Sequence, residues 1–448
     1  MYRTGYQIDH EIMRDDRDFS LVAVDEQGHR AYSGSGDIVS MRHTISVNDP
    51  NIIIGDVVTQ TVTIEFAMGI WGSSAGADAL DLNRGKKIRI YYWFPRSGGS
   101  GGKVPAGVFK VKDSTRNGDR LTVTARDCFY GMERPYDSTL TYPTTLNNVV
   151  QEIADQIGIP FKGLREPLRV LKGNLWEGYE YAQDVYLENI LVYSEGDKIV
   201  GSKLEGYTLQ KALSLCAGYY GLSAYQNREG YLDFYGPFNV GDYYPINLNR
   251  ADNPDIGKQS VCINQFSYID ANGNKIILDR TSVEEDEIPY ELILDNPLFW
   301  DDPDIPYQDY PEQADTICHM YIGMVYYSGK VYYRMGDPRL EVFDRAWLYD
   351  IVNNDGAPIV VSSLDYYFDG GLSVTVCSSV GDNVGNIGSS LNEQTETRGA
   401  KSSSKPTSSA NSGGPMSQKI EAMQKQINEL KKEIADLKRM ITPKKEER

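Results

Sequence analysis

The chain has 448 residues, more than one ordinary hydrophobic core accommodates, so two to four domains are expected. Hydrophobic residues make up 40% and charged residues 24%, which excludes a wholly disordered chain. Residues 401–448 contain 11 Lys and Arg against 6 Asp and Glu, so within the net charge of −18 the rest of the chain carries −23. Such an acidic body repels the phosphates of DNA, which argues against specific nucleic-acid binding, although it also simply favours solubility.

The beginning of the chain lacks the apolar stretch and cleavage site of a signal peptide. No run of 18 apolar residues occurs, so we expect no membrane span and synthesis in a cytoplasm. The five cysteines are odd in number and form no CxxC pair, which predicts reduced, partly buried thiols. Tyrosine is frequent at 32 residues and suits half-buried strands and wet interfaces, so the composition favours a β-rich protein.

Residues 1–127 are predicted to form a first β domain. Residues 57–66, 88–93 and 121–125 alternate between apolar and polar side chains, as half-buried strands do. The glycine-rich residues 95–102 separate the last two of these strands. Glycine runs can cradle phosphate, but no helix follows this one, so a hairpin loop is favoured.

Residues 128–240 are predicted to form an α+β middle region. Thr144 or Thr145 is a suitable cap for a helix that ends at Gly158. Thr208 is a suitable cap for a second helix. Residues 222–225 and 231–235, separated by an Asn-Arg-Glu-Gly turn, are typical of a β-hairpin.

Residues 241–385 are predicted to form a second β domain, which ends in a hairpin with its turn at residues 369–371. Within it, residues 283–315 are strongly acidic, and their prolines include Pro297, Pro303, Pro306 and Pro311. Clustered carboxylates can bind calcium, but the spacing of a calcium loop is absent. An extended, solvated loop is therefore favoured.

Residues 386–415 are rich in Ser, Gly, Asn and Thr, which predicts a flexible linker. Residues 416–442 then show apolar side chains at alternating spacings of four and three, which predicts a coiled coil with Ile at a and Met or Leu at d. The predicted oligomerisation seam consists of Met416, Ile420, Met423, Ile427, Leu430, Ile434, Leu437 and Ile441. The alternative is a single amphipathic helix that packs on the body of the chain.

The sequence contains no recognisable catalytic apparatus. No HExxH, GxSxG or GxxxxGKS motif occurs, and no cysteine lies at metal-ligand spacing near a histidine. We therefore expect no enzyme activity, no catalytic residue, no cofactor and no bound metal.

Several segments in order resemble the phage tail hub and tail-associated protein family. They are GVFKV at 107–111, LTVTARDCFYGMERPY at 121–136, the helix that follows, residues 206–235, DNPLFW at 295–300, residues 336–348 and residues 366–382. Each segment alone is weak evidence, whereas their order and spacing are more specific. The resemblance covers roughly residues 35–385.

The resemblance implies a mainly β fold in which two tail-tube-like β domains bracket the α+β region. It also implies a homotrimeric baseplate hub at the tail tip, whose three chains supply six tube-like domains to match a hexameric tube. Expected partners are the tail tube or distal tail protein and a spike, fibre or other baseplate protein, and an acidic lumen would let DNA slide past. Ile at a with Leu at d favours two strands over three, so the heptads leave dimer and trimer open.

Two other functions remain open from the sequence. A tail-associated cell-wall hydrolase would require a cleft with convergent acid and base groups, and a host-surface-binding adhesin would require exposed aromatic platforms. The host and the kind of particle, a virus, a tailocin or another injection machine, are not specified by the sequence.

Overall fold

The computed structural model describes residues 12, 19–47, 54–68, 76–94, 102–142, 144–163, 169–172, 183–186, 204, 206–237, 244–300, 310–350 and 355–378. All of them belong to one compact unit, Met1–Leu391. The predicted linker at 386–415 and the predicted coiled coil at 416–442 lie outside the described residues.

The fold is mainly β, as predicted. The first β-rich region contains β1 (Ser20–Asp25), β2 (Arg30–Tyr32), β3 (Ile38–Ser46), β4 (Thr59–Ala67), β5 (Lys87–Phe94), β6 (Gly102–Asn117) and β7 (Arg120–Arg126), with the short helix η1 (Gly76–Ala79). The second contains β12 (Tyr244–Asn247), η3 (Leu248–Arg250), β13 (Ala251–Ile269), β14 (Lys275–Arg280), β15 (Glu287–Leu294), η4 (Pro297–Phe299), α4 (Tyr310–Tyr321), β16 (Val325–Tyr333), β17 (Arg345–Asp350), β18 (Asp355–Val360), β19 (Ser363–Phe368) and β20 (Leu372–Ser378).

The middle of the chain contains the two helices and the hairpin that the sequence predicted, α2 (Leu146–Ile157), α3 (Leu209–Tyr219), and β10 (Ser223–Gln226) with β11 (Leu232–Tyr235). It also contains β8 (Arg169–Lys172) and β9 (Gln183–Tyr186), which the sequence analysis did not predict. The side chain of Thr145 accepts a hydrogen bond from the Asn148 N–H at the start of α2, and Thr208 does the same for Lys211 in α3. Gly158 ends α2 with a φ of 77°, a conformation that glycine adopts without steric cost.

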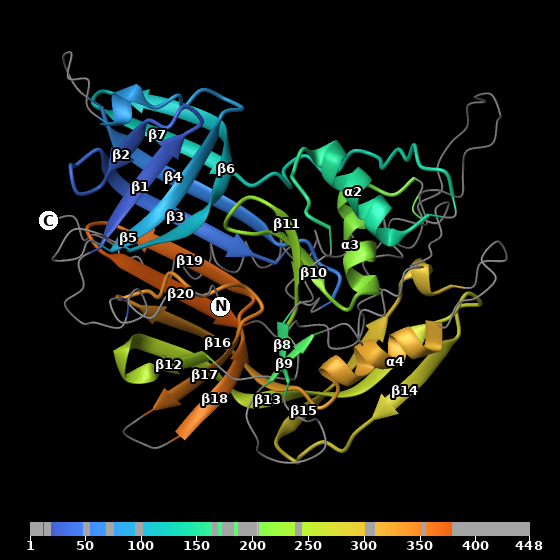
Figure 1. The fold of residues 1–448 in the computed structure, drawn as a ribbon. Helices are drawn as coiled ribbons and strands as arrows, with labels where there is room; N and C mark the ends of the chain where they lie inside the picture. Colours follow the sequence, from blue (N-terminus) through green and yellow to red (C-terminus); the bar gives the residue numbers. More distant parts are fainter. Residues whose placement is uncertain are drawn as a thin grey trace, which may run out of the picture. The chain divides into compact units, whose positions relative to one another are not determined.

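Strands of both β-rich regions join in one sheet (Figure 1). In the described part of the chain its order is β14-β13-β16-β20-β19-β3-β4-β7-β6-β5-β1-β2, with β15 also paired to β13. The two regions meet where β19 pairs antiparallel with β3, which places Leu364 opposite Ile45 and Tyr366 opposite His43. On the outer face Arg42 donates two hydrogen bonds to Asp365, at 2.9 and 2.7 Å, and this exposed pair adds at most about 1 kcal/mol.

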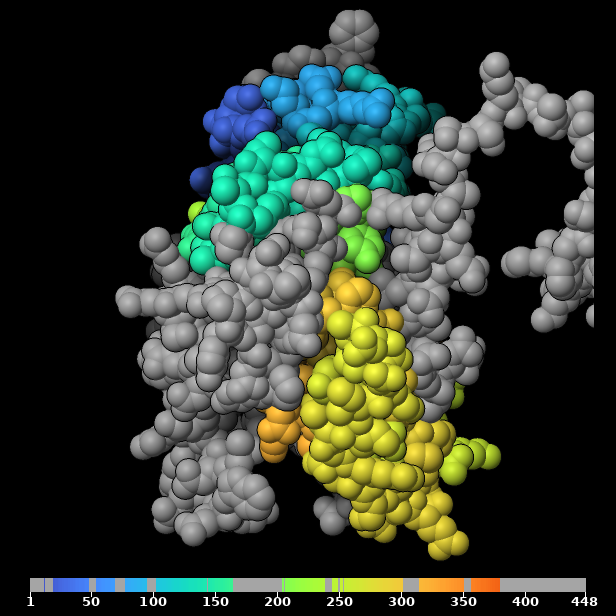
Figure 2. All heavy atoms as spheres, turned by 90° about the vertical axis from the view of Figure 1, so that its right-hand side faces the viewer, coloured from blue at the N-terminus to red at the C-terminus, as the bar shows by residue number. Residues whose placement is uncertain are grey.

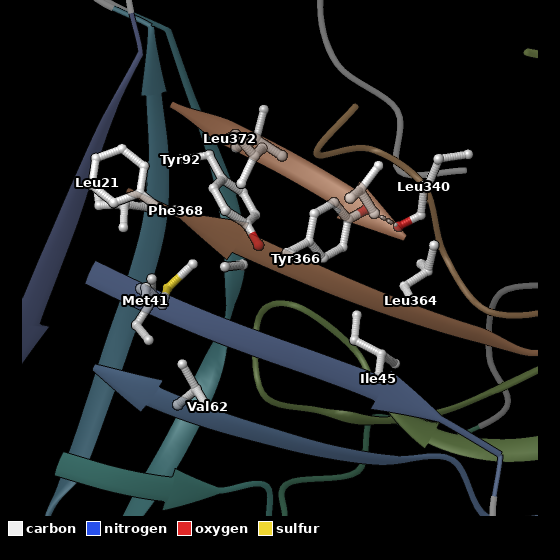
Figure 3. Close-up of a cluster of buried hydrophobic side chains, with 14 of the residues drawn as sticks. Leu21, Met41, Ile45, Val62, Tyr92, Leu340, Leu364, Tyr366, Phe368 and Leu372 are labelled. Carbon is white, nitrogen blue, oxygen red and sulfur yellow. Dashed lines mark hydrogen bonds between the residues drawn. The ribbon is translucent and has the colours of Figure 1, made fainter. Parts of the chain in front are cut away.

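Alternation along the strands gives this sheet one apolar face. On β4, Val62, Ile64 and Phe66 are buried, as are Val123 and Ala125 on β7, while the threonines between them are half-buried or exposed. Figure 3 shows side chains of β3, β4, β5, β19 and β20 packed against one another in a shared core. Both β-rich regions therefore bury their apolar face in the same place.

A second hydrophobic core lies around the helices. It joins α2, α3 and the β10–β11 hairpin to β15, α4 and the C-terminal half of β13. The second β-rich region is thus divided between the two cores. The domain ranges predicted from the sequence, 1–127, 128–240 and 241–385, stay a prediction. Each of the two cores contains residues from either side of these boundaries.

The extended, solvated loop predicted for residues 283–315 is wrong in part. Glu287–Leu294 form β15, which pairs in parallel with β13 and buries Tyr290, Leu292 and Leu294. Helix α4 begins at Tyr310 and buries Ala314, Ile317, Cys318 and Tyr321, which recur at helical spacing. Acidic residues lie between these apolar positions, on the solvent-facing sides of β15 and α4. They obscured the apolar spacing of both elements in the sequence.

No helix in the described ranges combines the length and hydrophobicity needed to cross a lipid bilayer. The five cysteines are free thiols, as predicted, and Cys216, Cys262 and Cys318 are buried.

The Tyr366 hydroxyl ties the shared core to the chain that precedes β17, because it donates to the carbonyl oxygens of Asp337 at 2.9 Å and Leu340 at 3.1 Å (Figure 3). We expect Tyr366→Phe to lower the free energy of unfolding by about 1 kcal/mol, since the two carbonyl oxygens lose a buried donor but keep another, the Leu340 N–H for Asp337 and the Arg228 guanidinium for Leu340. Urea unfolding followed by circular dichroism measures the change. Tyr367→Phe on the exposed face of the same strand is the control, and an equal loss in both variants would contradict the assignment.

Candidate assembly surfaces

The predicted oligomerisation seam, Met416 to Ile441, falls on residues that the structure does not describe. The body of the chain contains the described surfaces and junctions that could support assembly. In the described ranges no group of three or more His, Cys, Asp or Glu side chains is placed to hold a metal ion.

The turn between β10 and β11 inserts Arg228 into the protein interior. The Gly230 N–H donates to the Asn227 carbonyl at 2.8 Å, and Gly230 has a φ of 90°, so the turn is tight. The side chain of Arg228 is only 6% exposed and its Nε lies 3.1 Å from Glu341 Oε1. Its terminal nitrogens donate to the carbonyl oxygens of Pro105 at 3.1 Å, Leu340 at 2.8 Å and Pro338.

This arrangement joins three distant segments through one guanidinium. Pro105 belongs to β6 of the first β-rich region, whereas Pro338 to Glu341 precede β17. Burial, the largest single influence, would lower the pKa of Arg228, but the Glu341 carboxylate together with the nearby Tyr366 and Tyr92 side chains outweighs it and raises that pKa. A buried guanidinium is tolerated only when nearly all of its donors are satisfied, as they are here. Arg228 therefore fixes the helical part of the fold on the sheet.

The chain around residues 337–344 is shaped to meet Arg228. Phe343 is buried and has a φ of 71°, a left-handed conformation that costs a non-glycine residue free energy. Asp344 holds this bend, because its carboxylate accepts from the Glu341 N–H at 2.8 Å and from the Tyr235 hydroxyl at 3.1 Å. The surrounding hydrogen bonds thus offset the local strain.

A second buried network lies beside the first. His43 Nε2 is 3.2 Å from Gln60 Oε1, and Nδ1 is 3.1 Å from the Tyr92 hydroxyl. Since Gln60 Oε1 can only accept, Nε2 carries the proton and Nδ1 accepts from Tyr92. The Gln60 N–H in turn donates to Asp127 at 2.5 Å, and Gln60 Nε2 donates to the Gln226 carbonyl at 2.8 Å. This network connects β3, β4 and β5 to the β10–β11 hairpin.

A basic pocket, defined here by Arg84, Lys87, Lys110, Lys112 and Arg126, opens between the β5–β6–β7 strands and the end of α2. Its volume is about 350 Å³, within the usual range of ligand sites. Tyr130, 57% exposed, lies at its wall, with the Arg126 guanidinium 4.8 Å and the Lys112 ammonium 5.2 Å from the ring centre. Sequence analysis did not single out this pocket, although basic residues are conspicuously dense in this stretch.

The β14 strand exposes apolar side chains at one end of the sheet. Ile276 is 36% and Ile277 53% exposed, and in the described part of the chain β14 pairs only with β13. Figure 2 shows this yellow segment on the face toward the viewer. An edge strand with unpaired N–H and C=O groups can pair with another chain.

Comparisons with known proteins give likenesses in structure alone. No protein-family profile and no curated protein sequence matches the chain. The 43 kDa tail protein of prophage MuSo2 from Shewanella oneidensis matches 80% of this chain and 97% of its own, with 12% identity and a TM-score of 0.41. Prophage tail protein gp18 from Listeria monocytogenes EGD-e matches 84% of this chain and 98% of its own, with 11% identity and a TM-score of 0.44.

A third likeness is to the E. coli c3393 protein, a component of the type VI secretion system. It matches 78% of this chain and 75% of its own, with 9% identity and a TM-score of 0.34. The structural neighbours of this chain are phage tail and type VI secretion proteins. Phage tail proteins are also the class of protein that the sequence motifs of this chain resemble. Each of these TM-scores is below 0.5.

Removing the Arg228 guanidinium tests the junction. We expect Arg228→Met to lower the free energy of unfolding by about 3–5 kcal/mol, because the Glu341 carboxylate loses the opposite charge beside it and three carbonyl oxygens each lose a hydrogen bond. Urea unfolding measures this loss, and hydrogen exchange should show the β10–β11 hairpin opening first. Arg280→Met, at an exposed position of β14, is the matched control. A loss below about 1 kcal/mol at Arg228 would show that the junction does not hold the two parts together.

The buried His43 should make stability depend on pH. Burial lowers the pKa of His43 from 6.5 to about 4, so the unfolded chain takes up the proton first as the pH falls. Stability is therefore lost between about pH 6.5 and pH 4, by about 3 kcal/mol at most. We expect His43→Gln to remove this loss in thermal unfolding measured at several pH values, whereas exposed His319→Gln should not.

Asp127 should make stability depend on pH in the opposite direction to His43. Burial raises the pKa of Asp127 from 3.8 to about 7, despite the hydrogen bonds from the Gln60 and Phe129 N–H groups. The folded state then holds this proton longer than the unfolded state, and stability falls as the pH rises from about 4 to 7. Asp127→Asn should remove that fall, so the two variants should change the pH profile with opposite signs; changes of the same sign would contradict the network.

Proposed function

We propose that this chain is the structural hub at the tip of a phage or phage-like tail. In this proposal three copies form a ring that joins the hexameric tail tube to a spike, fibre or tip complex and leaves a channel for DNA. The chain would act through its interfaces and carry no catalytic site. It would reside in the virion tail, or at the corresponding place in a tailocin or secretion machine.

The pairing of β19 with β3 is the observation that supports this proposal most directly. It places the two β-rich regions of one chain side by side in one sheet, with their apolar faces in a shared core. A chain that contributes two neighbouring tube-like β regions needs such a lateral contact within itself. Three chains would then offer six β regions to a sixfold tube.

The segments that resemble the hub family also have clear structural roles. Residues 107–111 lie in β6, and residues 121–126 lie in β7. Asp127, which ends the turn Thr124-Ala125-Arg126-Asp127 within the second of these segments, is buried and accepts backbone hydrogen bonds from Gln60 and Phe129. The turn thus directs the chain from the sheet toward α2, which is a physical reason for an Asp at this position.

The ends of the sheet leave room for contacts between copies. In the ranges that the structure describes, β2 pairs only with β1, and β14 pairs only with β13. Two different ends that meet between copies make a heterologous contact, and such contacts generate closed rings when the rotation closes. The predicted coiled coil at residues 416–442 would add a second point of self-association.

The mass in solution tests this function. We expect the full chain to sediment at three times 50.3 kDa, and a version ending at residue 386 to remain trimeric if the ring contacts lie in the body. Sedimentation velocity over a range of concentrations measures both. A coiled-coil variant with Ile427→Asn and Leu430→Asn separates the two contributions.

Two outcomes would contradict the trimeric hub. A stable dimer of the full chain would mean that the heptads alone set the oligomeric state. A monomer at high concentration in every version would remove the ring and favour the hydrolase or adhesin alternatives.

A further inference from the structure

Residues 84–126 are strongly basic within an acidic chain. They contain 11 Lys and Arg and only 2 Asp, a net charge of +9, whereas the whole chain carries −18. Basic charge concentrated against the overall balance points to a surface that meets an acidic group.

The sheet register places several of these charges directly beside one another. Lys87 on β5 is opposite Lys110 on β6, and Lys110 is opposite Arg126 on β7. Residues directly opposite on neighbouring strands point to the same face, and like charges there destabilise the sheet. The row of like charges therefore destabilises the fold of the isolated chain, and an anion bound to it would offset this destabilisation.

A β-bulge adds a fourth charge to the row. The β6–β7 register shifts between Val111 and Asp113, so Lys112 is the extra residue without a partner on β7. Bulges commonly re-aim a side chain, and here Lys112 lies near the ring of Tyr130. Its ammonium therefore lies at the wall of the basic pocket.

The described residues supply little negative charge to this pocket. Among its lining residues Asp127 is the acidic one, and its carboxylate already accepts from the Gln60 and Phe129 N–H groups. The Nε atom of Arg126 is buried and makes no hydrogen bond within the described part of the chain. The pocket thus presents a row of cations, and one acidic side chain whose oxygens already accept hydrogen bonds, to a ligand with carboxylates.

An acidic turn of suitable chemistry lies at the β14 end of the sheet. Between β14 and β15, Glu284, Glu285 and Asp286 are exposed. The Glu287 N–H donates to the Glu284 carbonyl at 3.2 Å, and the Glu284 N–H donates to Glu287 Oε2 at 3.0 Å. The turn is therefore preorganised, which lowers the entropic cost of binding.

The turn is too distant to fill the pocket of its own chain. In the sheet order β13, β16, β20, β19, β3 and β4 lie between β14 and β7. Neighbouring strands are about 4.8 Å apart, so roughly 20 Å or more separates turn and pocket within one copy. The acidic turn of a second copy is not limited by this distance.

We propose that the basic pocket of one copy receives the acidic turn, Glu284 to Asp286, of a second copy. The contact is head-to-tail, because the pocket and the turn lie toward different ends of the sheet, and repetition of it closes a ring. This inference rests on the proposed ring function and names the contact that would close it. The charges would also steer the copies together and make association depend on salt.

Zero-length crosslinking of the full chain tests this contact directly. A carbodiimide joins an amine to a carboxylate only where the two touch, and an equal mixture of unlabelled and ¹⁵N-labelled chains separates links between copies from links within one. We expect mass spectrometry to find Lys87, Lys110 or Lys112 joined to Glu284, Glu285 or Asp286 between copies. Links from these lysines only to other carboxylates, or only within one copy, would overturn the assignment.

Charge reversal supplies the quantitative test. We expect K87E/K110E and E284K/E285K each to weaken self-association of the full chain about tenfold or more at 50 mM salt, and the combination of all four changes to restore it. K258E/K330E, which reverses two exposed lysines on β13 and β16, makes the same charge change away from the pocket and should have little effect. Thermal unfolding of each variant checks that the fold is intact.

The outcomes separate this inference from the proposed function. If the wild-type chain is trimeric and neither charge reversal weakens it, the hub stands and the pocket contact is wrong. If K87E/K110E weakens association but the four-fold combination does not restore it, the occupant is another acidic group and this inference is wrong. A monomeric wild-type chain would overturn the ring itself.

Discussion

The buried guanidinium of Arg228 is the interaction on which the arrangement of this fold depends. It lies in a two-strand hairpin of the helical part, yet its partners are a strand of the first β-rich region and the chain before β17. These segments are more than 100 residues apart in the sequence. An apolar side chain could fill the same space, but it would leave the carbonyl oxygens unpaired and would tolerate several orientations. The directional N–H donors of Arg228 allow only one orientation of the hairpin.

Local elements of the fold were predictable from the sequence, because their determinants are local. The caps Thr145 and Thr208, the glycine that ends α2 and the alternation in β4 and β7 act over a few residues. The strand β15 and helix α4 were missed because their acidic solvent-facing residues dominated the composition of residues 283–315. Examining the spacing of Tyr290, Leu292 and Leu294 apart from the charges would have revealed β15.

The assembly surfaces were less predictable, because they arise from register and from contacts between distant segments. Nothing near Arg228 in the sequence distinguishes it from a solvated turn residue, and its burial depends on the chain around residues 337–344. The basic pocket likewise exists because the pairing of β5, β6 and β7 aligns Lys87, Lys110 and Arg126. The high density of basic residues was visible in the sequence. The sequence did not show which of these residues share one face of the sheet. The coiled-coil seam is a local pattern and stays a prediction.

The strand β13 has a mechanical consequence. Its first residues, Ala251 and Ile256, pack against the core shared by the two β-rich regions, while Val261, Ile263 and Phe266 are buried in the core around the helices. One continuous strand therefore runs through both cores. A force that pulls them apart along the strand direction would load its hydrogen bonds with β15 and β16 in shear, so that many must break together. The two parts of the body should consequently transmit an axial load as one stiff element, without a hinge between them.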